Sequence, residues 1–194
     1  MSSYSLSFTG CALRKAESII LARHYDGTGD WAKTRRAAID DDLLMIQALS
    51  SRKRVIQELI KRLDTLSTSE NSFLINSTPT EQNLLLWVAV CRAYQFADDF
   101  SRGVLAERMK GSSRVITRGV IEDFCDEQAV THPELHKISD QTHIRMRNQF
   151  LQMVREAGLI DDAGRIQRVF ISPELKKLLN IARGNETAIF PIAR

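Results

Sequence analysis

The chain has 194 residues and a mass of 22.0 kDa, which fits one domain or two small ones and excludes a large multidomain enzyme. Hydrophobic residues make up 43% and charged residues 26%, an ordinary balance for a folded globular protein, and the formal net charge is +3. The longest uninterrupted apolar run, 84–91, is far shorter than the roughly 20 residues that cross a bilayer. The three cysteines are odd in number and widely spaced. We therefore expect a cytoplasmic protein that has no disulfide and does not enter a membrane.

Helical periodicity dominates residues 1–112. Apolar side chains recur every three or four positions from Leu13 and again from Val55, as they do on one face of an amphipathic helix. The strongest start signal is Thr78-Pro79-Thr80-Glu81, which combines a capping box with proline in the first helical turn. The apolar residues that follow, 84–94, surround the whole helix. We predict that they form the central helix of an N-terminal helical bundle.

The sequence changes character after Lys110-Gly111-Ser112-Ser113, the clearest boundary in the middle of the chain. We predict a second domain over 113–183 and an irregular tail over 184–194. A long helix capped by Ser139 or Asp140 precedes residues 159–171, where apolar and polar side chains alternate around a turn. The expected fold class is mainly α, with an N-terminal helical bundle and a C-terminal winged helix-turn-helix domain that carries a small β-hairpin.

This C-terminal order of helix, hairpin and helix suits DNA recognition, because a winged helix-turn-helix places its recognition helix in the major groove and its wing on the backbone. The long helix offers Arg, Asn and Gln, which match the edges of guanine and adenine, and the hairpin offers arginines suited to phosphates. The candidates are Arg145, Arg147, Asn148, Gln149, Gln152, Arg165 and Arg168. A polar helix face that is merely solvated, or that binds a protein, is the alternative reading.

A second group of basic residues lies in the N-terminal part. Residues 1–70 hold 11 basic and 9 acidic side chains, 71–130 hold 6 and 8, and 131–194 hold 10 and 7, so the ends are basic and the middle is not. The N-terminal candidates for contact with a polyanion are Arg35, Arg36, Arg52, Lys53, Arg54, Lys61 and Arg62. The alternative is a solvated helix face on which Glu58 pairs with neighbouring arginines.

Enzyme motifs are weak. Asp162 followed by Glu174 and a lysine copies the spacing of a nuclease metal site, but Pro173 predicts a helix where such a site needs a strand. Cys125 stands alone where a zinc site expects a pair, and Pro133 disrupts the helical spacing of the nearby histidines. We expect no catalytic residue, no metal and no cofactor, and therefore no enzyme.

Several short motifs run through the whole chain. They are Tyr4-x-x-Ser7-Phe8-Thr9-Gly10, Gly29-Asp30-Trp31, Ser51-x-x-Arg54, Arg62-Leu63 and Ala157-Gly158-Leu159-Ile160. Together they resemble the BrxA family, a small component of the BREX bacteriophage-exclusion systems. The resemblance implies a mainly helical cytoplasmic protein without enzymatic activity, which binds DNA alongside larger BREX subunits. It transfers the basic positions Arg54 and Arg62 and, in the C-terminal part, Arg145, Arg147, Arg165 and Arg168.

The functional hypothesis is a non-catalytic, duplex-DNA-binding accessory protein of a BREX-type phage-defence system. Its expected partners are double-stranded DNA, contacted largely through backbone phosphates, and other BREX proteins. Two alternatives stay open. One is a protein–protein adaptor in the defence complex, and the other is an RNA-binding helical bundle, which a comparison of RNA with duplex DNA would separate.

Overall fold

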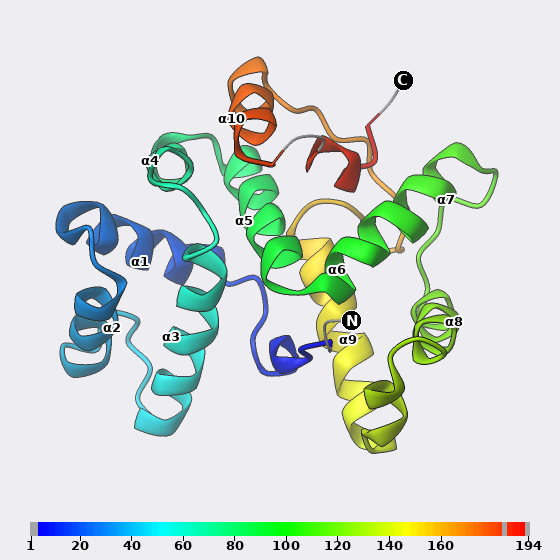
Figure 1. Ribbon diagram of the computed structural model, residues 1–194, viewed down its shortest axis with the longest axis horizontal. Helices are drawn as coiled ribbons and strands as arrows, with labels where there is room; N and C mark the ends of the chain where they lie inside the picture. The colour runs from blue at the N-terminus through cyan, green and yellow to red at the C-terminus, as the bar shows by residue number, and fades with distance from the viewer. Residues whose placement is uncertain (1–3, 184–185, 193–194) are drawn as a thin grey trace.

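The computed structural model describes residues 4–183 and 186–192, and within these residues it is helical and contains no strand (Figure 1). The α-helices are α1 (Lys15–Thr28), α2 (Trp31–Asp40), α3 (Leu49–Leu63), α4 (Thr68–Asn76), α5 (Pro79–Ala93), α6 (Gln95–Phe100), α7 (Ala106–Lys110), α8 (Arg118–Ala129), α9 (Asp140–Glu156) and α10 (Pro173–Arg183). The short elements are η1 (Ser7–Gly10), η3 (Pro133–Lys137) and η4 (Glu186–Ile189), which are 3-10 helices, and the π-helical turn η2 (Ser101–Leu105). The predicted mainly α class is confirmed.

Helix α5 is the centre of the N-terminal part, as predicted. Its capping box is complete, because the Glu81 N–H donates to the Thr78 hydroxyl while the Glu81 carboxylate accepts from the Thr78 N–H at 3.3 Å. Every residue from Leu84 to Cys91 is buried. Helices α3, α4 and α6 pack around α5, so its apolar surface is covered on several sides.

An aromatic cluster joins the two ends of the chain. Phe150, fully buried on α9, lies with its ring 5.8 Å from that of Phe8 in η1 and 5.9 Å from that of Trp87 in α5. It also packs edge-on against Phe96 at 5.0 Å and Phe100 at 4.9 Å. Both predicted domains, 1–112 and 113–183, therefore contribute to one core, and the boundary between them stays a prediction.

A buried ion cluster holds the C-terminal segment. The Arg92 guanidinium of α5 donates to Glu70 of α4 at 2.7 Å and to Glu186 of η4 at 2.5 Å, and its side chain is only 4% exposed. η4 lies within the predicted irregular tail, of which 184–185 and 193–194 lie outside the described residues. One arginine thus connects three elements that are distant in sequence, and all three charges are paired inside the protein.

The predicted β-hairpin over 159–171 is wrong, although its turn is present. The Gly164 N–H donates to the Asp161 carbonyl at 2.9 Å. Gly164 has a left-handed backbone with φ of 78°, and a Cβ there would lie 2.4 Å from the Ile116 carbonyl oxygen. A glycine is therefore required at this position, but the two sides of the turn do not continue as strands.

Antiparallel pairing in this region is limited to isolated bridges. Two isolated antiparallel bridges form, Ile160 with Ile166 and Val115 with Arg165. Beyond them the Gln167 N–H donates to the Leu159 carbonyl, whereas the Val169 N–H donates to the Pro191 carbonyl at 3.4 Å. The two sides diverge because the residues before Leu159 end α9 and use their N–H groups within that helix. The winged-helix unit predicted for 113–183 therefore lacks its β-sheet in the described structure.

Loss of the Phe150 ring should destabilise the whole protein. We expect Phe150→Ala to lower the free energy of unfolding by about 3 to 5 kcal/mol, because it leaves a cavity between the two ends of the chain. Urea denaturation followed by circular dichroism measures this. Ile144→Ala on the same helix, at a side chain that is 48% exposed, is the control and should change stability by less than about 1 kcal/mol. Equal losses in the two variants would contradict the central position of Phe150.

Glu70 should make stability depend on acidic pH. Burial raises the pKa of this carboxyl, but hydrogen bonds from Arg92 and Ser67 outweigh burial and hold the pKa below its ordinary value. Its stabilisation is therefore complete above the pKa of an unfolded glutamate and is lost as the pH falls through the lower, folded value. Urea titrations from neutral to acidic pH should show that Glu70→Gln is least stable relative to wild type at neutral pH, with the difference shrinking on acidification.

The exposed Glu107→Gln is the control for this titration, and its difference from wild type should stay near zero throughout. A Glu70→Gln difference that does not change with pH would show that the Glu70 charge contributes nothing to folding.

Candidate nucleic-acid interface

Helix α9 presents a polar stripe to solvent. Ser139 caps the helix by accepting from the Thr142 N–H at 3.3 Å, and Met146, Phe150, Met153 and Val154 face the core. The exposed residues recur at helical spacing on the opposite side and are Asp140, Gln141, Ile144, Arg145, Asn148 and Gln152. Three of the predicted contact residues, Arg145, Asn148 and Gln152, therefore share one face of one rigid element.

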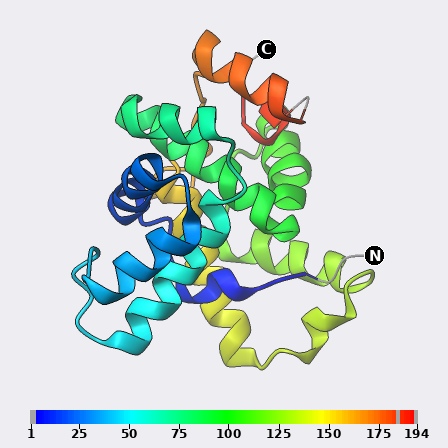
Figure 2. The same ribbon diagram turned by 60° about the vertical axis from the view of Figure 1, so that its left-hand side comes forward.

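The N-terminal strap, residues 4–13, lies between α3 and α9. In Figure 2 it is the dark blue segment that passes between cyan α3 and yellow α9. Its Leu13 N–H donates to Glu156 at the end of α9 over 2.8 Å, and Arg54 Cζ of α3 lies 3.5 Å from the position that a Cβ would take on Gly10. The strap thus lies between α3, which carries Arg54, and the recognition-helix candidate α9.

A cluster of polar side chains fastens the strap to α3. Lys61 donates to the hydroxyls of Ser5 at 3.0 Å and Ser7 at 3.1 Å, and its ammonium lies 4.4 Å from the centre of the Tyr94 ring. Burial raises the pKa of Tyr94 to about 12, so its hydroxyl keeps its proton and donates to Glu58 at 2.5 Å. Lys61 is half-buried and holds the strap, so only part of its charge faces solvent.

Two arginines of the predicted N-terminal group are committed to the interior. Arg62 is 3% exposed and donates to the carbonyls of Ala12 at 2.7 Å and Cys11 at 2.8 Å. Arg52 donates to the Ile39 and Ile46 carbonyls, both at 2.9 Å, and pairs with Asp42 at 2.5 Å. Both guanidinium groups donate to nearby backbone carbonyls, so we do not assign them to phosphate contact.

The other N-terminal candidates are exposed and lack an ion pair with any described residue. They are Arg35 and Arg36 on α2 and Lys53 and Arg54 on α3. Because α2 packs on α3, and α3 lies against the strap, these cations occur on neighbouring elements. Arg145 of α9 is likewise exposed, and it too forms no ion pair within the described chain.

The remaining C-terminal candidates differ in how free their charges are. Arg147 forms an ion pair with Glu122 of α8, and the Gln152 amide donates to Glu156 at 2.7 Å. Gln149 is half-buried. Arg165, just after the turn, pairs with Asp161 at 2.9 Å, although its side chain is 69% exposed. Arg168 is exposed and forms no ion pair with a described residue, but it lies beside the C-terminal segment rather than on the α9 stripe.

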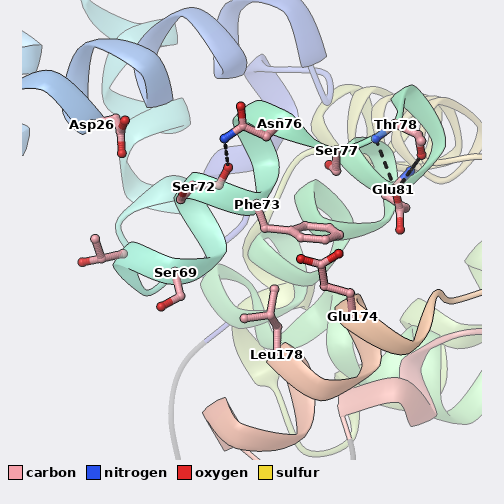
Figure 3. Close-up of a pocket in the computed structure, with 11 residues that line it drawn as sticks. Asp26, Ser69, Ser72, Phe73, Asn76, Ser77, Thr78, Glu81, Glu174 and Leu178 are labelled. Atoms are coloured by element: carbon pink, nitrogen blue, oxygen red, sulfur yellow. Dashed lines mark hydrogen bonds between the residues drawn. The ribbon is translucent and has the colours of Figure 1, made fainter.

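One cavity has an acidic lining that does not suit a polyanion. It has a volume of about 750 Å³ and lies between α4, the start of α5 and α10 (Figure 3). Phe73, Leu178 and Glu174 face one another across it, and Asp26 and Glu81 add two more carboxylates, while no lysine or arginine is among the described residues that line it. Phosphates would be repelled there, so the cavity is not part of the candidate interface. In the described residues no group of three His, Cys, Asp or Glu side chains is placed to hold a metal ion.

Sequence periodicity missed the strap. Its residues form no amphipathic pattern, and only the motif that begins at Tyr4 marked it as important. In the structure the Tyr4 hydroxyl donates to Asp99 at 2.5 Å and Gln128 at 2.7 Å, and the Tyr4 ring stacks on His132 at 3.6 Å. The concentration of Tyr4, Phe8 and Leu13 in a short segment without helical spacing was the available signal, because isolated large apolar residues of this kind are usually buried.

The internal role of Arg62 leads to a stability prediction. We expect Arg62→Ala to lower the free energy of unfolding by about 3 kcal/mol, because two strap carbonyls lose charged donors in a buried site. Arg54→Ala is the matched control, since Arg54 lies on the same helix but is exposed, and it should cost less than about 0.5 kcal/mol. Thermal and urea denaturation measure both. If Arg62→Ala is as stable as wild type, the strap does not depend on this arginine.

Comparison with known proteins places the chain in a family. Residues 2–182 match the family described as BrxA. The "BREX protein BrxA" of Escherichia coli O9:H4 (strain HS) is 24% identical over 172 residues, which cover 88% of this chain and 81% of that protein. The crystal structure of an uncharacterized protein from Magnetospirillum magneticum superposes with a TM-score of 0.83 at 19% identity, covering 97% of this chain and 96% of that one, so the fold is shared. None of the described helices is long and apolar enough to span a membrane. Because the family match extends over almost the entire sequence, this chain belongs to the BrxA family.

Proposed function

We propose that this protein is a non-catalytic, duplex-DNA-binding component of a BREX-type phage-defence system, and that it acts in the cytoplasm with other BREX proteins. The family assignment and the relative named BREX protein BrxA support the defence role. DNA binding is supported by the distribution of charge on the surface.

The observation that carries DNA binding is a set of exposed cations without ion pairs in the described structure, on elements that lie next to each other. Lys53 and Arg54 on α3 and Arg145 on α9 lie on the two elements that flank the strap, and Arg35 and Arg36 extend the set onto α2. Cations left free on adjacent elements are suited to successive phosphates of a nucleic acid backbone.

Helix α9 is the element that we assign to the DNA groove. It follows α8 after residues 130–139, a connection that contains η3 and is longer than the turn of a helix-turn-helix, and Asn148 and Gln152 stand beside Arg145 on its exposed face. These side chains fit the edges of bases in the wide major groove of B-form DNA, whereas the deep, narrow groove of A-form RNA does not admit a helix. Arg165, after the turn at the end of α9, adds a phosphate contact.

A gel-shift series tests the proposal. Duplexes of unrelated sequence should all bind, because phosphate contacts supply most of the affinity, and base contacts from α9 should add smaller differences between sequences. The logarithm of the binding constant should fall linearly with the logarithm of salt concentration, by about 0.9 for each neutralised phosphate. Arg54→Glu and Arg145→Glu should each weaken binding about tenfold at moderate salt, and each should reduce the salt slope by about 1.

Lys177→Glu is the matched control, because it makes the same charge change on exposed α10, which lies at the top of Figure 1 away from the strap. It should leave affinity within about twofold, once the change in overall charge is included. Equal weakening by all three variants would show that only net charge matters. No shift of any duplex near physiological salt would overturn the DNA-binding role.

A further inference from the structure

The segment 167–171 has the sequence of a strand without the partners of one. Val169 and Ile171 are partly buried against the core, while Arg168 and Phe170 are exposed, so side chains alternate as they do in a strand. Phe170 is 81% exposed, although aromatic rings are normally buried. β-branched and aromatic residues favour strands, so local preference and the observed structure disagree at this place. Disagreements of this kind concentrate at functional sites.

In this segment every second residue forms backbone hydrogen bonds with the rest of the protein. The Gln167 N–H donates to Leu159 at 2.9 Å and the Val169 N–H to Pro191 at 3.4 Å, which is the alternate bonding of an extended chain with one side toward the protein. The N–H and C=O groups of Arg168 and Phe170 form no hydrogen bond with a described residue. They offer donors and acceptors in the pattern of an open strand edge.

Two cavities lie beside this edge, and Arg168 lines both. One, of about 470 Å³, has an apolar floor that includes Met109 and Pro191, and its basic residues are Lys110, Arg114 and Arg168. The other, of about 600 Å³, is lined in part by Leu84, Ala157, Val169 and Phe170. Both are large enough to receive side chains of an added peptide.

The charge of the smaller cavity selects for an acidic occupant. Among the described residues no carboxylate lines it, and of its three basic side chains only Lys110 forms an ion pair with a described residue, Glu107 at 2.7 Å. Arg114 and Arg168 are exposed and remain available. An occupant with acidic groups at the rim and apolar groups on the floor complements this surface in charge and polarity.

We propose that the edge 167–171 receives an extended, acidic segment of a partner protein by strand addition. Backbone bonds to Arg168 and Phe170 would hold the segment, apolar side chains would enter the cavities, and carboxylates would pair with Arg114 and Arg168. A polypeptide fits better than DNA, because a phosphodiester backbone has no N–H groups to donate to the free carbonyls and no apolar side chains to fill the cavities. The inference goes beyond DNA binding and does not depend on it.

The test uses a defined probe, a fluorescein-labelled synthetic peptide of alternating glutamate and valine, titrated with the full chain by fluorescence anisotropy. A peptide with lysine in place of glutamate should bind at least about tenfold more weakly, because it meets two free arginines. Arg168→Glu should weaken binding of the acidic peptide by a similar factor, and Arg168→Lys should restore most of it.

A pair of variants at one position separates backbone pairing from side-chain contact. Phe170→Ser removes the ring and keeps the N–H, whereas Phe170→Pro removes both, and no native hydrogen bond is lost in either case. We expect Phe170→Pro to bind the acidic peptide about tenfold more weakly than Phe170→Ser, with unfolding midpoints near that of wild type. Amide hydrogen exchange should show new protection at Arg168 and Phe170 when the peptide is added.

Three results would overturn the proposal. They are equal affinity of wild type, Phe170→Pro and Arg168→Glu for the acidic peptide; equal binding of the acidic and lysine peptides; and binding without amide protection at 168 and 170. If instead Arg168→Glu weakens duplex DNA as much as Arg54→Glu does and DNA displaces the peptide, the edge is a nucleic-acid contact. If the Phe170→Pro variant binds duplex DNA with wild-type affinity in gel shifts, the DNA-binding proposal holds whichever result the peptide gives.

Discussion

The position of Phe150 in the aromatic cluster is the constraint on which the rest of the structure depends. This one ring contacts η1, α5 and α6, so α9 cannot turn about its axis without opening the core. Fixing α9 also fixes which of its side chains face solvent. The exposed stripe with Arg145 and Asn148 is therefore a consequence of packing on the opposite side. A rigid face is what groove recognition requires, since mobile side chains lose more entropy on binding.

Charge in this protein has two separate uses. Arg62 and Arg92 are enclosed and satisfy carbonyls or carboxylates that would otherwise be buried without partners, and the half-buried Arg52 bonds two carbonyls and Asp42. Arg54 and Arg145 stand in solvent and form no ion pair within the described chain. Only the second group can exchange counterions for phosphates, because an enclosed guanidinium would have to abandon its bonds first. The interface that we propose is accordingly smaller than the basic residues of the sequence suggest.

The two proposed surfaces divide the molecule between two kinds of partner. The α3, strap and α9 surface carries cations on helices and suits the regular spacing of phosphates. The edge at 167–171 carries free backbone groups beside apolar cavities and suits a polypeptide. A protein that holds DNA on one surface and a partner chain on another would couple the two physically.

The sequence by itself determined the mainly α class, the capping box at Thr78 and the burial of the helix that follows, because these depend on residues close together in the chain. The family was also recognisable from short motifs, and the match over residues 2–182 confirms it. Only the tertiary structure decided that Arg62 is buried while Arg54 on the same helix is exposed, since a strap from the other end of the N-terminal part covers one side of α3. It also decided that residues 159–171 form no hairpin. A strand needs a neighbouring segment whose backbone N–H and C=O groups are free, and the residues before Leu159 already use their N–H groups within α9.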